Sequence, residues 1–215
     1  NTGKRFNRDW IFRHLNYQFV SGAHYAITGA NGSGKSTLLQ VISGAIAPSE
    51  GGISYQQSAI SSQLSAVSGQ QSGMGGIGDE IYRYVSITAP YLELIEEMTL
   101  KEFLLFHSKF KPLLPAVTVD DIIHIITLEA ATHKQIRYFS SGMKQRVKLA
   151  QSFFSNTPVI LLDEPCTNLD ADGIALYLKL VNDYCRDRLV IVSSNDPVEY
   201  SFCKEVIRIG EYKKV

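Results

Sequence analysis

The chain has 215 residues, which suits one substantial domain or one domain with a subdomain. Its 21 Lys and Arg balance its 21 Asp and Glu, so no overall basic field attracts nucleic acid, and no acidic tail is present. The three cysteines form no C-x-x-C pair, an arrangement typical of reduced core residues and consistent with a cytoplasmic location. The longest apolar runs are strand-sized and too short to cross a bilayer.

Short apolar runs and helical patterns alternate through the first part of the chain. A helix is expected from Ser36, ending at Gly44. Strands are expected at residues 10–12, 17–20, 25–28 and 51–55. Residues 56–78 are rich in Gln, Ser and Gly, and predict a flexible loop, with a partner-binding insertion as the alternative.

The second part combines a helical block with buried strands. Thr99 and Glu102 form a capping-box pattern that predicts a helix start. The further helices are expected at residues 117–128, 141–154 and 172–185, and the strands at 81–87, 159–162, 189–193 and a closing hairpin of 206–209 with 212–215. Because the runs at 159–162 and 189–193 lack alternation, they suit parallel strands buried on both faces. The chain is therefore predicted to be an α/β protein with a mainly parallel sheet and an inserted helical subdomain at residues 92–155.

A glycine-rich stretch follows the expected strand at 25–28. Gly29-x-x-x-x-Gly34-Lys35-Ser36 matches the P-loop pattern, with a strand before it and a helix after it. Glycines allow backbone N–H groups to turn around an anion, and the following helix points its positive end at the same place. Lys35 would neutralise the outer phosphates of ATP, and the Ser36 hydroxyl can bind Mg²⁺. The expected phosphate-binding residues are Asn31, Gly32, Ser33, Gly34, Lys35, Ser36 and Thr37. The alternative is a glycine turn with an incidental lysine.

Two carboxylates end the apolar run at 159–162. Asp163 would reach Mg²⁺, and Glu164 would polarise the attacking water. An ordinary solvated acidic turn is the alternative.

The run 138–146, YFSSGMKQR, resembles the signature motif of the ATP-binding cassette (ABC) family, written L-S-G-G-Q and followed by Q-R. The matching residues are Ser140, Gly142, Gln145 and Arg146, and the departures are Phe139, Ser141 and Met143. Residues 167–170, ending at Asp170, resemble the family's D-loop. Phe6 stands where the family places an aromatic residue on adenine, with Trp10 as the second candidate and core packing as the alternative for either ring.

The resemblance implies a single nucleotide-binding domain over residues 1–215, built on a P-loop NTPase core with an antiparallel β subdomain. Ser140 or Ser141 can cap the helix that begins at the signature. In the family this helix end meets the γ-phosphate of another protomer, so Ser140, Ser141, Gly142 and Met143 are expected to act across a head-to-tail dimer, with a second copy or a similar cassette.

Two positions depart from the family pattern. Pro90 occupies the place of a glutamine that contacts Mg²⁺ and the membrane partner, and Glu93 is the nearest group that could compensate. Asn195 replaces the switch histidine, and an amide cannot carry a proton near neutral pH. We therefore expect Glu164, Lys35 and Asn195 to support weak ATP hydrolysis.

The resemblance implies the ATP-binding and ATP-hydrolysing subunit of an ABC transporter, on the cytoplasmic face of the membrane. We expect a separate transmembrane permease, docked near residues 91–97, and no nucleic acid. The length also resembles ATPase subunits of simple exporters, including the haem-exporter type of cytochrome c maturation. A soluble non-transport ABC ATPase and a slowly hydrolysing ATP-gated regulator are the alternatives.

Overall fold

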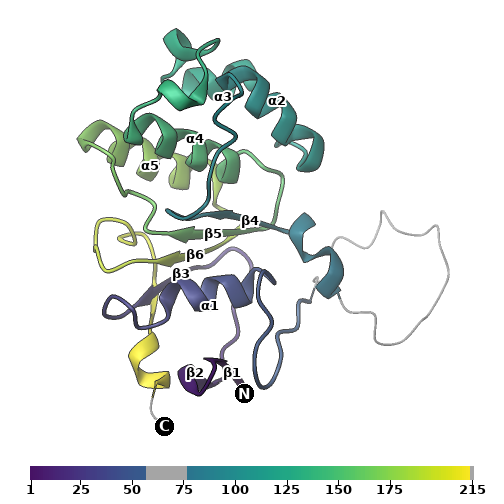
Figure 1. The fold of residues 1–215 in the computed structure, drawn as a ribbon, viewed down its shortest axis with the longest axis vertical. Coiled ribbons are helices and arrows are strands. Elements are labelled where there is room, and N and C mark those ends of the chain that lie inside the picture. The colour runs from purple at the N-terminus through teal and green to yellow at the C-terminus, as the bar shows by residue number, and fades with distance from the viewer. Residues whose placement is uncertain (57–76, 214–215) are drawn as a thin grey trace, which may run out of the picture.

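A five-stranded parallel sheet forms the centre of the protein. The computed structural model describes residues 1–56 and 77–213, so the predicted loop at 56–78 lies almost wholly outside the described residues. The strand order is β4-β5-β6-β3-β7, and every neighbouring pair is parallel (Figure 1). The strands are β3 (His24–Thr28), β4 (Val85–Thr88), β5 (Val159–Asp163), β6 (Leu189–Ser193) and β7 (Glu205–Arg208). The predicted α/β class with a mainly parallel sheet is confirmed.

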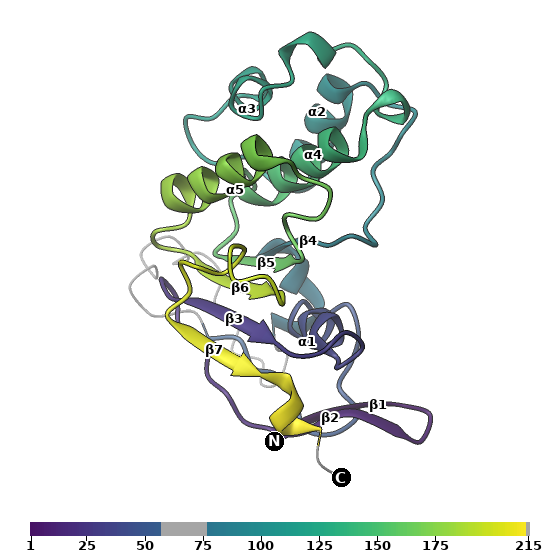
Figure 2. The same cartoon turned by 90° about the vertical axis from the view of Figure 1, so that its left-hand side faces the viewer.

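Helices cover both faces of this sheet, which explains why its central strands are apolar without alternation. Ile160 and Leu162 of β5 pack with helices α2 to α5 on one face. Leu161 between them packs with α1 (Lys35–Ile42) on the other face. Figure 2 shows α4 and α5 on the opposite side of the sheet from α1. Two cores therefore share one sheet.

A two-stranded antiparallel sheet lies beyond α1. Its strands are β1 (Thr2–Phe6) and β2 (Asp9–Leu15), and it is separate from the parallel sheet. Phe12 of β2 is fully buried in the core on the α1 face. The antiparallel part of the predicted fold is thus confirmed, and it lies next to the N-terminal end of α1.

The helical block is made of α2 (Leu100–Phe110), α3 (Val119–Ile125) and α4 (Ser141–Phe153). The capping box of Thr99 and Glu102 is confirmed at the start of α2. A second capping box, of Thr118 and Asp121, starts α3 inside the predicted range 117–128. Short 3₁₀ turns, Glu129–Ala131 and Ile136–Tyr138, connect α3 to α4. The chain then returns to the sheet at β5, and α5 (Ala171–Tyr184) leads on to β6.

Two of the predicted strands are wrong because side chains, not strand pairing, fix those segments. Residues 17–20 form no strand; Tyr17 and Phe19 instead pack around Tyr25, with ring centroids 4.9–5.8 Å apart. Residues 51–55 also form none, since Gly51 turns with φ +70° and the Tyr55 hydroxyl donates to the Ile42 carbonyl.

Two further predictions need correction. Residues Ile77–Arg83 form a 3₁₀ helix, so only the end of the predicted strand at 81–87 belongs to β4. The closing hairpin is wrong as well. β7 pairs in parallel with β3, and Ile209–Tyr212 then forms a 3₁₀ turn, in which Ile209 is fully buried. Residues 214–215 lie outside the described part of the chain.

Candidate functional site

The predicted P-loop connects β3 to α1 at the carboxyl end of the sheet. Gly34 lies immediately before α1 with φ +105°, and no side chain caps the helix there. A Cβ atom at Gly34 would lie 2.3 Å from Cγ2 of Ile11, and one at Gly29 would lie 2.7 Å from Cγ2 of Ile209. Glycine is therefore required at both ends of the loop by backbone angle and by close approach. The first turn of α1 is left with N–H groups that an anion can bind.

Lys35 lies inside this loop. Its side chain is only 6% exposed, and Nζ donates to the Gly29 carbonyl at 2.8 Å and reaches the Ala30 carbonyl at 3.5 Å. An ammonium group that faces two backbone carbonyls at the start of α1 can bind a phosphate oxygen at the same place. Asn31 and Gly32 are exposed, and Ser33 is buried with an Oγ that has no partner among the described residues. Ser36 and Thr37 occupy the partly buried first turn of α1.

Asp163 and Glu164 lie where β5 ends. Asp163 is 2% exposed, and its Oδ1 has no hydrogen-bond partner in the described residues. Glu164 is partly exposed, adopts a left-handed φ of 45° and donates its N–H to the Ser193 carbonyl at 2.9 Å. Because β5, β6 and β3 are neighbours and parallel, their carboxyl ends meet at one edge, where ligands of open α/β sheets bind.

Asn195, just beyond β6, contacts the P-loop directly. Its Oδ1 accepts from the Gly29 N–H at 3.2 Å, and its Nδ2 donates to Oδ1 of Asn31 at 3.1 Å. The structure therefore places Asn195 beside the loop that carries Lys35, while Glu164 is bonded to the strand from which Asn195 follows. Four of the predicted residues therefore follow neighbouring strands: Lys35 starts the helix after β3, Asp163 and Glu164 end β5, and Asn195 comes just after β6.

The signature segment starts α4, and Ser140 rather than Ser141 is the cap. Its Oγ accepts from the Met143 N–H at 3.2 Å. Ser141 is exposed at the first position of the helix, and Gly142 lies so close to the next loop that a Cβ would meet the Asn168 carbonyl at 3.0 Å. Ser140 to Met143 line a surface cavity of about 450 Å³. The signature segment leads into α4 on one face of the sheet, whereas the P-loop leads into α1 on the other (Figure 1).

Asp170 caps α5 and contacts the signature helix. Its Oδ1 accepts from the Gly173 N–H at 2.8 Å and faces Nη2 of Arg146 at 3.4 Å. The Gly173 N–H and then the Arg146 guanidinium hold the pKa of Asp170 below its usual range. The predicted D-loop is thus joined to α4 by an ion pair.

The two aromatic candidates, Phe6 and Trp10, differ in how exposed their rings are and in how many cations lie beside them. Phe6 ends β1 with its side chain 48% exposed, and Nζ of Lys4 lies 5.0 Å from its ring centroid. Trp10 is partly buried, and the guanidinium groups of Arg5 and Arg13 lie 5.4 and 4.4 Å from its ring. Phe6 therefore offers the freer surface of the two, on the sheet whose Ile11 contacts Gly34.

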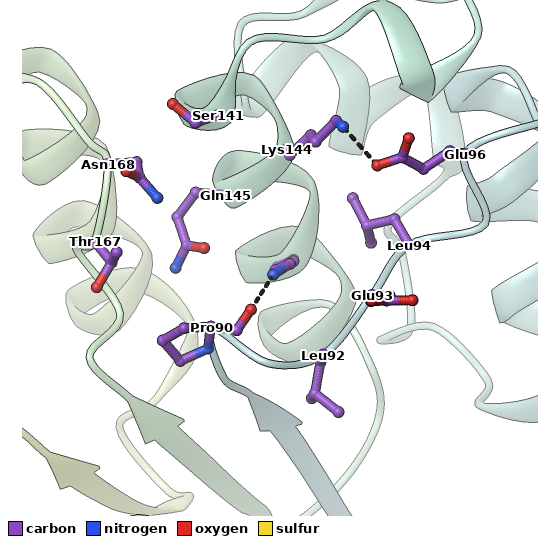
Figure 3. A pocket seen from close by; sticks show the side chains of 11 residues that line it. Pro90, Leu92, Glu93, Leu94, Glu96, Ser141, Lys144, Gln145, Thr167 and Asn168 are labelled. Carbon is purple, nitrogen blue, oxygen red and sulfur yellow. Dashed lines mark hydrogen bonds and ion pairs between the residues drawn. The ribbon is translucent and has the colours of Figure 1, made fainter.

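Pro90 and Glu93, the residues at the expected glutamine position, line a second cavity of about 380 Å³ beside α4 (Figure 3). The Pro90 carbonyl accepts from Lys148 Nζ at 3.0 Å, and Lys144 forms an ion pair with Glu96 in the same cavity. Burial lowers the pKa of Lys148. Neither lysine was predicted from the sequence as a site residue, although their i, i+4 spacing places both on one face of α4.

Two further contacts were also missed. Gln145 is buried, and its Nε2 donates to the Pro165 carbonyl at 2.7 Å, next to Glu164. Glu199 is buried behind the same segment, and its Oε1 accepts from the Cys166 N–H at 2.7 Å. No motif in the sequence signals Glu199, because its partner is a backbone group 33 residues away.

The fold and the loop geometry define a P-loop nucleotide-binding protein. Comparison with known proteins makes the class specific: the family model described as ABC transporter matches residues 12–167. The chain belongs to the ABC transporter family, whose ATP-binding cassettes bind and hydrolyse ATP. These matches favour a transporter ATPase over the non-transport alternative.

Similar proteins agree with this family. The chain is 28% identical to an uncharacterized ABC transporter ATP-binding protein, YybJ, of Bacillus subtilis, over 91% of this chain and 83% of that protein. It is 27% identical to the cytochrome c biogenesis ATP-binding export protein CcmA of Agrobacterium fabrum, over 98% and 93% of the two chains. Among solved structures, an ATP-binding subunit of an ABC transporter has a TM-score of 0.79 at 22% identity, covering 97% of this chain and 84% of that chain. A dimeric post-hydrolysis ATP-binding cassette with ADP and Pi has a TM-score of 0.74 at 23% identity, covering 98% and 93%.

Proposed function

We propose that this chain hydrolyses Mg-ATP in a site made by its P-loop, Asp163, Glu164 and Asn195, and that the site is closed by the signature segment of a second cassette. The observation that carries the proposal is the meeting of a buried lysine, a glycine-lined helix start and two carboxylates at the ends of β3 and β5. On this proposal residues 1–215 act as one nucleotide-binding domain, and residues 92–155 act as its helical subdomain.

The donors present fit a magnesium ion that arrives with the nucleotide. Asp163 is buried with one oxygen unpartnered, so a cation there would complete its contacts. In the described part of the chain, no cluster of three His, Cys, Asp or Glu side chains could form a protein-only cage. Mg²⁺ usually binds through one or two carboxylates together with substrate phosphates, so Asp163 and the Ser36 hydroxyl suffice as protein ligands. When bound, Mg²⁺ would neutralise charge on the β- and γ-phosphates.

The residues of the site then have separate tasks. Lys35 and the N–H groups of the loop bind the phosphates, while Phe6 offers its exposed ring to adenine. Glu164 orients a water against the γ-phosphorus and accepts its proton as the new P–O bond forms. The bond from phosphorus to the β-phosphate oxygen breaks, and ADP leaves with the electron pair. Asn195 hydrogen-bonds the γ-phosphate and takes no proton.

A second cassette is needed because the signature and the P-loop of one chain lead into helices on opposite faces of the sheet. The N-terminus of α4 carries the positive end of the helix dipole and the Ser140 hydroxyl. Two copies related by a two-fold axis would place each α4 against the other copy's P-loop. The dimeric form of the similar cassette supports this arrangement.

A separate membrane protein would receive the motion of the dimer. None of the helices in residues 1–56 and 77–213 has the length and apolar character of a bilayer span. The cavity beside α4, lined by Pro90, Glu93 and Glu96, is the proposed docking site, which would place the chain on the cytoplasmic face of the membrane. The name of the export protein CcmA favours export as the direction of transport, and the name of the bacitracin transport protein BcrA of Bacillus licheniformis agrees with a transport role.

The test of this function is the Glu164→Gln variant. Removing the proton acceptor is expected to lower phosphate release by about 100-fold or more while ATP affinity stays within about twofold. The same variant should form an ATP-dependent dimer, measured by light scattering at saturating Mg-ATP. Glu129→Gln, at an exposed carboxylate in the helical block, is the matched control. Unchanged phosphate release in Glu164→Gln would show that Glu164 is not the proton acceptor.

The amide at the switch position favours a slowly hydrolysing cassette. Asn195 has both ends of its amide bonded to the P-loop, so it positions the loop but transfers no proton. We expect Asn195→His to raise the turnover number several-fold, whereas Asn195→Ala should lower it. Equal turnover in wild type and Asn195→His would show that this position does not limit the rate.

A further inference from the structure

Glu199 is a buried carboxylate that the proposed mechanism does not use. It lies in the turn after β6, with its side chain 5% exposed. Its backbone is fixed on both sides: its N–H donates to the Asp196 carbonyl at 3.1 Å, and its carbonyl accepts from the fully buried Tyr177 hydroxyl at 2.7 Å. These two hydrogen bonds fix the backbone of Glu199 and thereby the position from which its carboxyl group extends.

The Glu199 carboxyl group contacts the loop that carries Glu164. Oε1 of Glu199 accepts from the Cys166 N–H at 2.7 Å, two residues beyond Glu164. Pro165 has no N–H, and its carbonyl accepts from Gln145. Together with the bond from the Glu164 N–H to Ser193, three contacts from β6, α4 and the Glu199 turn fix the segment 164–166.

Glu164 needs this support because of its backbone. Its φ of 45° lies in the left-handed region, which residues other than glycine occupy only where surrounding contacts over-determine the conformation. A carboxylate that orients a water must also keep its position to within a fraction of an ångström. The Glu199 contact therefore acts on the residue whose placement matters most.

The same turn is continuous with Asn195. The Asp196 N–H donates to Ser194 Oγ at 2.9 Å, and the Val198 N–H donates to Asp196 Oδ1 at 2.9 Å, so residues 194–199 form one bonded unit. Asn195 in turn contacts Gly29 of the P-loop. Glu199 thus connects the segment of Glu164 to the segment of Asn195.

Burying the Glu199 carboxyl group costs free energy that packing alone does not explain. Its Oε2 has no hydrogen-bond partner in the described residues. Burial raises the pKa of Glu199, while the Ser194 hydroxyl and the Cys166 N–H oppose that rise. An apolar side chain of similar size would avoid burying an unpaired oxygen, so what Glu199 supplies beyond packing is an acceptor for the Cys166 N–H, next to the Ser194 hydroxyl.

We propose that Glu199 is a positioning residue for ATP hydrolysis, which keeps Glu164 and Asn195 in register by accepting the Cys166 N–H. The proposal rests on the proposed function of the site. It assigns Glu199 no contact with ATP, Mg²⁺ or the attacking water.

Two substitutions of similar volume separate the acceptor from the packing. Glu199→Gln keeps an oxygen that can accept from Cys166, and Glu199→Met fills the space without one; Glu199→Ala is the smaller variant without an acceptor. Cys203→Ala, which removes a partly buried side chain four residues further along, is the packing control. Steady-state hydrolysis gives the turnover number and KM, and ATP affinity is measured separately by equilibrium binding.

We expect Glu199→Met and Glu199→Ala to lower the turnover number about tenfold or more, with ATP affinity within about twofold of wild type. Glu199→Gln should retain at least about half of the turnover number, as should Cys203→Ala. A wild-type turnover number in a folded Glu199→Met or Glu199→Ala chain would overturn the proposal. Equal losses in the Gln and Met variants, or a parallel loss of ATP affinity, would overturn it too.

Amide hydrogen exchange tests the same contact without hydrolysis. In the nucleotide-free chain, exchange at Cys166 should be about tenfold faster in Glu199→Met than in wild type or Glu199→Gln. Equal exchange at Cys166 in all three chains would overturn the positioning contact. Because this readout needs no ATP, it stays decisive for Glu199 even if wild type released no phosphate, a result that would count against the proposed function alone.

Discussion

The two helix starts proposed to meet ATP are built differently. α1 begins at Gly34, in a left-handed conformation without a side-chain cap, and buries Lys35 inside its own loop. α4 begins at Ser140, whose hydroxyl accepts from the Met143 N–H, and Ser140 and Ser141 are both exposed. The N-terminus of α1 therefore leaves its N–H groups and the Lys35 charge available to a ligand that enters the loop. The N-terminus of α4 is already capped, so it can contact only a ligand that is held by another segment. The difference suggests that ATP binds first to the P-loop and that the signature segment closes on it afterwards.

The largest expected effect comes from inactivating the P-loop helix start on one chain and the signature helix start on another, and then mixing the two chains. Lys35→Ala should abolish ATP binding, because it removes the charge at the centre of the loop. Ser140→Asp keeps a good N-cap but adds a negative charge that repels phosphate, so it should bind ATP yet release almost no phosphate. When the chains of an equal mixture pair at random, half of the dimers are mixed, and each mixed dimer holds one intact site.

The mixture should therefore recover about a quarter of the wild-type phosphate release, although each variant alone is inactive. Mixing Lys35→Ala with the chain carrying both substitutions is the matched control, since no intact site can form. An inactive mixture of the two single variants would contradict the arrangement in which each chain completes the other's site.

A smaller effect is expected from the glycines at the start of α1. Gly34→Ala places a Cβ 2.3 Å from Ile11 at φ +105°, and should lower the free energy of unfolding by about 2 kcal/mol or more. Gly32→Ala has φ +73° but open space around the new Cβ, and should cost about 1 kcal/mol. Urea unfolding measures both. Equal losses would mean that backbone angle alone, and not the contact with β2, fixes glycine at the loop.

The sequence predicted the parallel sheet and the P-loop better than it predicted the contacts between loops. The runs at β5 and β6 are apolar throughout because both faces are covered, and Ser140 and Thr99 are local side-chain caps that the sequence pattern reveals. The predicted strand at 17–20 failed because its aromatic residues pack around Tyr25, a tertiary effect that overrides strand propensity.

The site shows the same division. Lys35 and Asp163 follow from local motifs, since their neighbours along the chain position them. Glu199 and Lys148 could not be predicted, because each bonds a backbone atom of a segment far away in the sequence. Almost any residue type supplies the same backbone N–H or carbonyl, so a contact with the backbone leaves no pattern in the sequence.

The smallest expected effect sharpens the comparison on the α4 side, where the cap of α5 is tied to the signature helix. The Gly173 N–H and Arg146 lower the pKa of Asp170, so its ionised form is favoured in the folded state. A lowered carboxylate pKa contributes stability above the unfolded value of about 3.9, and that contribution is lost as the pH falls through the folded value. Asn is also a good N-cap, so Asp170→Asn should keep the cap and lose only the charge. Urea unfolding should therefore show Asp170→Asn slightly less stable than wild type at pH 7, with a difference that shrinks as the pH falls below the unfolded value, while Asp170→Ala is less stable throughout. A difference between wild type and Asp170→Asn that persists unchanged at pH 3 would show that the charge on Asp170 does not connect α4 to α5.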